Sequence, residues 1–141
     1  MTLHHAEHAV EEISAEECWK LLAAETIGRL GTVSVDATTG DPSVDVFPVN
    51  FLTHEGAIFF RSGPGSKLMD ITANDRVAFE IDGQSHIANW SVVVHGRAHR
   101  LSQDRDIEES GLLALEPVHP TDKWNYVRID VESVTGIRFR R

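Results

Sequence analysis

Two cationic side chains, Arg61 and Lys67, and two hydroxyl side chains, Ser62 and Ser66, fall within seven positions of the segment Phe59–Leu68, FFRSGPGSKL. Two phenylalanines precede them and glycines separate them, so the segment reads as a turn from a strand into a helix. A helix N-terminus presents unpaired N–H groups, and its dipole favours an anion. These residue types predict a phosphate-binding turn, with a solvated surface turn as the alternative.

The turn departs from two common nucleotide-binding motifs. The P-loop spacing, G-x-x-x-x-G-K-[ST], is absent. A dinucleotide fingerprint needs a third glycine and a βαβ context, and neither is present. The turn alone therefore identifies no nucleotide.

The composition predicts one soluble globular domain. The chain has 141 residues, 41% of them hydrophobic and 25% charged, with a formal net charge of -9. That charge argues against nucleic acid or an anionic membrane as a partner. A single cysteine and the lack of a long apolar run favour a cytoplasmic protein. We expect residues 1–12, with His4, His5 and His8, to form a flexible tail and not a metal site, and residues 13–141 to form the domain.

The pattern of apolar residues predicts a mainly β fold. A capping box at Ser14 and Glu17 begins a helix that Gly28 should end. Short helices are also expected over 66–75 and 103–115. Alternation predicts strands over 29–35, 43–52, 57–62, 76–83, 90–102, 125–131 and 135–140. Pro48 should lie at an edge or a bulge. Six or seven antiparallel strands are best protected in a small closed barrel.

The order of the segments FPVNF, FFRS, GSKL, RVAFEIDG and WSVVVHGRA resembles the pyridoxamine 5′-phosphate oxidase-like family of FMN-binding split barrels. The match is closest to its short branch, which includes nitroimidazole-resistance-type flavoproteins, and covers Cys18 to Arg138. The resemblance implies an antiparallel Greek-key split barrel that forms a homodimer, with FMN in clefts between the subunits. The unbroken apolar run Trp90–Val94 should then be covered on both faces, by the barrel core and by the partner, or else by helices.

The resemblance also implies which residues bind the cofactor. The strand around Asn50 should run along the flavin, Arg61 and Lys67 should hold its phosphate, and Trp90 should reach it from the second subunit. An Asn bonded within its sheet and a Trp in the core are the alternatives. The positions carried over are Val49, Asn50, Phe51, Phe60, Arg61, Ser62, Ser66, Lys67, Trp90, Ser91, Trp124 and Arg138.

Some residues depart from the family pattern. The C-terminus reads Arg138-Phe139-Arg140, without the Arg-x-His pair that relatives use on pyridoxal phosphate. Nitroimidazole-resistance relatives often have histidine around the phosphate turn, where this sequence has Arg61 and Ser66. We therefore expect neither vitamin B6 oxidation nor nitroimidazole resistance as such.

The function predicted is that of an FMN-dependent oxidoreductase acting on a small organic molecule. No acid–base constellation stands out, as expected where hydride passes directly to or from the flavin. A flavin carrier or sensor without turnover is a second hypothesis. A haem protein, with His86, His95 or His99 as ligand, is a third, and a barrel that binds the deazaflavin F420 is a fourth.

Overall fold

The computed structural model describes residues 10–62, 71, 73–101 and 125–140. Within them the chain forms one helix and seven strands: β1 (Val10–Ile13), α2 (Ala15–Ala24), β2 (Ile27–Val35), β3 (Pro42–His54), β4 (Ala57–Ser62), β5 (Arg76–Gln84), β6 (Ala88–Arg100) and β7 (Asn125–Arg140). No helix of this part is long and apolar enough to cross a membrane.

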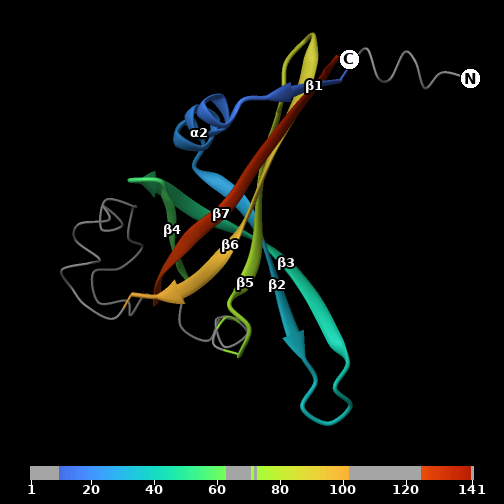
Figure 1. The fold of residues 1–141 in the computed structure, drawn as a ribbon, viewed down its shortest axis with the longest axis vertical. Helices are drawn as coiled ribbons and strands as arrows, with labels where there is room; N and C mark the ends of the chain where they lie inside the picture. The colour runs from blue at the N-terminus through green and yellow to red at the C-terminus, as the bar shows by residue number, and fades with distance from the viewer. Residues whose placement is uncertain (1–9, 63–70, 72, 102–124, 141) are drawn as a thin grey trace, which may run out of the picture.

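All strand pairings are antiparallel, and the sheet order is β1-β7-β4-β3-β2-β5-β6. An additional pairing of β7 with β6 closes six of the strands into a ring, and β1 is added on β7 (Figure 1). The ring confirms the predicted antiparallel split barrel. The helices expected over 66–75 and 103–115 lie outside the described residues, apart from 71 and 73–75.

Alternation along the strands builds the barrel core. In β5, Val77, Phe79 and Ile81 are buried while the residues between them are not. The Phe79 ring meets the Phe51 ring of β3 edge to face, with centroids 4.8 Å apart. Because successive strand side chains point to opposite faces, the sequence pattern alone determines which side chains enter this core.

Helix α2 begins where it was predicted. The Ser14 hydroxyl oxygen accepts a hydrogen bond from the Glu17 N–H at 3.2 Å, and Cys18 and Leu22 are buried. The predicted end at Gly28 is wrong, because the helix stops at Ala24. Gly28 lies in β2, where an added Cβ would sit 2.1 Å from the Phe79 ring. The glycine therefore serves the close approach of an aromatic side chain.

The two closing strands predicted over 125–131 and 135–140 are a single strand, β7. The residues between them, Glu132, Ser133 and Val134, include no Gly, Pro, Asn or Asp, so the strongest strand breakers are missing there. Glu132 of β7 is an extra residue in the pairing with β6, because His95 pairs with Ser133 and Gly96 pairs with Val131. Strand β1 begins at Val10, so the predicted tail of residues 1–12 overlaps the sheet by three residues.

Strand β3 changes partner along its length. It pairs with β2 over 42–50 and with β4 over 51–54. Pro48 pairs with Arg29 of β2 and has no β4 residue on its other side. A residue without an N–H is tolerated at such an open position, which agrees with the edge expected for Pro48.

The hairpin formed by β2 and β3 projects from the barrel (Figure 1). The pairing of β2 with β5 covers only residues 29–32 of β2, so its last three residues pair with β3 alone. We call residues 33–46 the arm.

Candidate functional site

The first group of predicted site residues lies where β3 meets β4. Phe51 pairs with Phe60, and both side chains are in the core, at 1% and 0% exposure. Any ligand contact of these two would therefore be through the backbone. Val49 is also buried, whereas Asn50, between Val49 and Phe51, is exposed on the outer face of the sheet.

Arg61 and Ser62 follow at the end of β4. Both are half-buried, and they pair with Tyr126 and Asn125 at the start of β7. Arg61 offers a full positive charge and Ser62 a hydroxyl, so this strand end has the donor types that a phosphate needs. Ser66, Lys67 and Trp124, which were predicted to join them, lie outside the described residues.

The second group lies at the far end of β6 and β7. Trp90 pairs with Arg138, and Ser91 pairs with Ile137. The Trp90 ring lies against Gly83, where an added Cβ would be 2.5 Å from the indole. Nη2 of Arg138 donates to Oε1 of Glu17 at 2.8 Å, which ties this end of β7 to helix α2.

The two cations of these groups, Arg61 and Arg138, do not meet within one chain. Arg61 is opposite Tyr126, and Arg138 lies twelve positions further along β7. At about 3.3 Å per strand residue, that is about 40 Å along the strand. One mononucleotide cannot touch both ends of β7, so a single copy brings together only part of the predicted site.

A charged cluster on the outer face was not predicted from the sequence. The Arg29 guanidinium contacts Oε1 of Glu80 through Nε at 2.7 Å and Nη2 at 2.6 Å, and Oδ1 of Asp82 at 3.2 Å. Burial raises the pKa of Glu80, Arg29 partly offsets the rise, and the Asp82 carboxylate adds to it. The register places Asn50, beside β2, and Ser91, beside β5, on either side of this cluster.

Two buried polar atoms have no hydrogen-bond partner within the described part of the chain: Oγ1 of Thr32 and Oδ1 of Asn89. Asn89 directly precedes Trp90 in β6. A buried acceptor without a donor carries a desolvation penalty that a ligand N–H would relieve. Asn89 is therefore a candidate contact that sequence reasoning missed, on the face of β6 opposite to the Trp90 side chain.

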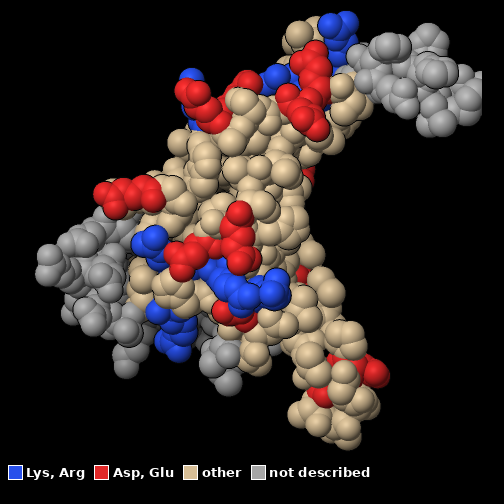
Figure 2. Space-filling view, viewed as in Figure 1, with Lys and Arg blue, Asp and Glu red and all other residues tan. Residues whose placement is uncertain are grey.

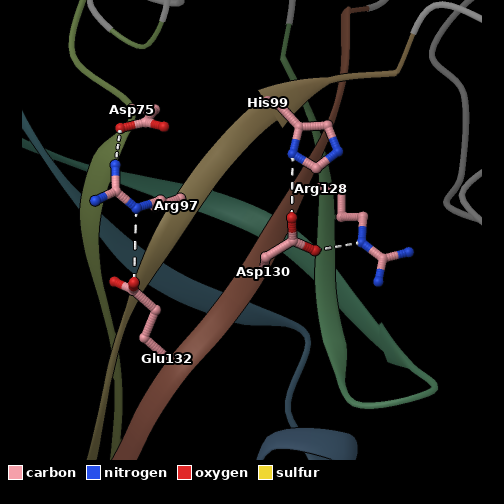
Figure 3. A network of polar contacts seen from close by, with 6 residues as sticks. All are labelled: Asp75, Arg97, His99, Arg128, Asp130 and Glu132. Atoms are coloured by element: carbon pink, nitrogen blue, oxygen red, sulfur yellow. Dashed lines mark hydrogen bonds and ion pairs between the residues drawn. The ribbon is translucent and has the colours of Figure 1, made fainter.

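A second charged network joins β5, β6 and β7 (Figure 3). Arg97 bridges Asp75, at 2.8 Å, and Glu132, at 3.6 Å. Asp130 lies between Arg128, at 2.7 Å, and His99, at 3.4 Å. All these groups are roughly half-exposed, so each pair contributes little to stability, and of these pairs Arg97–Glu132 and His99–Asp130 join β6 to β7.

No group of three metal-ligating side chains occurs among the residues in the structure. The histidines of the haem hypothesis lie apart: His86 is exposed in the turn between β5 and β6, His95 is on the outer face, and His99 contacts Asp130. They give no shared ligand site within one copy.

Comparison with known proteins places the whole barrel in one family. The sequence profile of the family described as pyridoxamine 5′-phosphate oxidase matches residues 14–138. The chain belongs to this pyridoxamine 5′-phosphate oxidase family. The match runs from the cap of α2 to Arg138, and so includes every described residue predicted to bind the cofactor.

Two solved structures of similar sequence are described as FAD-binding proteins. The one from Mycobacterium smegmatis is 32% identical, covers 93% of this chain and 99% of its own, and has a TM-score of 0.76. The one from Mesorhizobium loti is 29% identical, covers 92% and 97%, and has a TM-score of 0.70.

The fold extends to a more distant protein. A candidate 5-nitroimidazole antibiotic resistance protein from Bacteroides thetaiotaomicron is 14% identical, with a TM-score of 0.72 over 93% of this chain and 89% of its own. At this identity the likeness concerns the fold alone.

Proposed function

We propose that this protein binds a flavin nucleotide between two copies of the chain and acts as an oxidoreductase on a small organic molecule. The observation that carries the proposal is the position of the two residue groups at opposite ends of β7. A homodimer in which Arg61 of one copy approaches Trp90 and Arg138 of the other would assemble one site from both groups, and symmetry would form it twice.

The residues present fit an FMN molecule. Arg61 and Ser62 would hold its phosphate, and Asn50 would meet the edge of the ring from the outer face of β3. Trp90 of the second copy, which packs partly against its own barrel core, would offer the rest of its indole surface, whereas Asn89 Oδ1 lies on the opposite face of β6. The flavin supplies hydride transfer when bound, and the protein orients it and excludes water.

FAD is a second candidate, because two structurally similar relatives of about 30% identity are described as FAD-binding. FAD contains the riboflavin phosphate of FMN, so the same residues would serve it. The additional adenylate would have to find its own contacts. Binding of FMN and FAD therefore has to be compared directly.

The test is a titration of the protein with FMN, FAD and riboflavin, followed by flavin fluorescence and the visible spectrum, which also separates flavin from haem and F420. Arg61→Ala should weaken FMN binding about 10–100-fold, the effect of one lost charge-assisted hydrogen bond. Riboflavin, which has no phosphate, should lose little. Lys20→Ala, on the exposed face of α2, is the matched control.

Failure to bind any of the three flavins would refute the proposal. If Arg61→Ala loses affinity for FMN and for riboflavin equally, Arg61 does not bind the phosphate.

A further inference from the structure

One face of the arm is an exposed strip of valines. Val33 pairs with Val44, and the register places Val35 and Val46 on the same face. Val35, Val44 and Val46 are 57%, 70% and 67% exposed. Figure 2 shows the arm as a largely uncharged projection with acidic groups near its tip. Nothing of the described chain covers these valines. An isolated hairpin is at best marginally stable in water, and a large exposed apolar patch is typical of an interaction surface.

The strip continues into a hollow on the outer face of the barrel. Its volume is about 270 Å³, with the small residues Gly31 and Ala78 on neighbouring strands and with Val33 and Val44 from the base of the arm. An added Cβ at Gly31 would meet nothing of its own chain closer than 3.6 Å. The hollow therefore has room for a side chain that its own chain does not supply.

The rim of the hollow and the tip of the arm carry opposite charges. Arg76 gives the hollow a positive charge and makes no ion pair within the described part of the chain, and the His95 side chain lines the hollow beside it. Glu132 also lines it, but its carboxylate faces Arg97 at 3.6 Å. At the tip, Asp36 and Asp41 are exposed, and hydrogen bonds from the N–H groups of Thr39 and Thr38 lower the pKa of Asp36, so its carboxylate stays ionised.

We infer that the occupant of the hollow is the arm of a second copy of this chain. In this arrangement the two arms cross, each valine strip packs into the hollow of the other copy, and each acidic tip approaches the partner copy's cationic rim. The strip and the hollow lie side by side on one face. A two-fold axis between them therefore places the strip of each copy on the hollow of the other. The inference rests on the homodimer of the proposed function and assigns the surface that forms it.

This surface differs from the one that the apolar run Trp90–Val94 pointed to. Val92 and Val94 are fully buried in the barrel core, and only Ser91 and Val93 face outward, half-buried. A charge at Val92 would therefore unfold the barrel, whereas a charge on the arm would not. Dimerisation is better tested with the exposed valines.

The experiment measures the dimer dissociation constant by sedimentation equilibrium, with circular dichroism to confirm folding. Val44→Asp, which puts a charge into both copies of the contact, should weaken the dimer at least tenfold. Gly31→Val should do the same by filling the hollow from within its own chain. Ile87→Asp is the matched control, since Ile87 is 77% exposed in the turn between β5 and β6, away from the arm.

A wild-type dimer that survives both Val44→Asp and Gly31→Val unchanged would overturn the arm assignment and leave the shared flavin site in place. The arm assignment is also overturned if Ile87→Asp weakens the dimer as much as Val44→Asp does. A wild-type protein that stays monomeric overturns the arm assignment and the shared site together. A flavin titration of each variant separates the two proposals, because a dimer that binds no flavin contradicts only the proposed function.

Discussion

Arg138, near the end of β7, donates a hydrogen bond to Glu17, in the first turn of α2, across 121 positions of sequence. Both side chains are partly exposed, at 33% and 47%. The arginine that the proposed flavin site requires is thus already held by a carboxylate of its own chain. Its charge is available to a ligand only if Glu17 shares or releases it.

Removing the charge of Glu17 should strengthen flavin binding. A partly exposed ion pair contributes up to about 1 kcal/mol, so Glu17→Gln should tighten FMN by up to about fivefold. Arg138→Ala should weaken FMN about tenfold, as the loss of a charged contact. Arg128→Ala, which breaks a similar pair with Asp130, is the control. Equilibrium titration that finds wild-type affinity in Arg138→Ala would exclude this arginine from the site.

Two glycines should resist even the smallest substitution. An added Cβ at Gly28 would lie 2.1 Å from the buried Phe79 ring, and one at Gly96 would lie 2.2 Å from the backbone oxygen of Asp130. Gly28→Ala and Gly96→Ala should each lower the free energy of unfolding by about 1–3 kcal/mol, as overpacking does. Gly31→Ala, with no contact closer than 3.6 Å, should change it little. Urea denaturation distinguishes them, and equal stability of all three variants would contradict the packing described.

The pH dependence of stability should carry a contribution from Glu80. Its pKa is raised above the usual 4.5, chiefly by burial, so the folded state binds this proton more tightly than the unfolded state. Its contribution to the free energy of unfolding is then complete below the usual pKa and is lost as pH rises through the folded pKa. Urea unfolding between about pH 4 and pH 7 should show wild type losing stability relative to Glu80→Gln. If wild type instead gains stability relative to Glu80→Gln as pH rises, the sign is reversed and the explanation is wrong.

Pyridoxamine phosphate should be a poor substrate despite the family's name. A second anion site is needed for the substrate phosphate, and four arginines of the described part already contact carboxylates: Arg29, Arg97, Arg128 and Arg138. Leaving a buried phosphate without partners costs orders of magnitude in kcat/KM. Steady-state assays on flavin-loaded protein should remain below about 10⁴ M⁻¹s⁻¹, the low end for dedicated enzymes. A higher value would show that the protein does provide an anion site for the substrate phosphate.

Local patterns predicted much of this fold. Alternation located the strands, and the capping box located the start of α2, because both signals depend on residues a few positions apart. The end of α2 was misplaced because Gly28 responds to Phe79, fifty-one positions away in sequence. The two predicted closing strands are one, because the break expected after Val131 is an irregularity at Glu132 across which β7 stays paired with β6.

The candidate site was predictable by residue type and not by arrangement. Arg61 and Ser62 stood out as donors, and the structure describes them at a strand end. The contact of Arg29 with Glu80 depends on the register between β2 and β5, which turn lengths and bulges set and which no local motif encodes. That the groups at Arg61 and Arg138 are separated could be read only from the length of β7.

The single long strand β7 also governs when the barrel can form during synthesis. It closes the ring by pairing with β4 and β6, and it is the last strand in chain order. While a ribosome adds about 5–20 residues per second, the hairpin of β2 and β3 and that of β5 and β6 can pair early, because their contacts are local. Until residues 125–140 have left the ribosome, β4 and β6 each keep an unpaired edge, and such edges attract other chains. Ring closure therefore waits until β7 is available, and the interval before it is when a nascent chain most needs protection from aggregation.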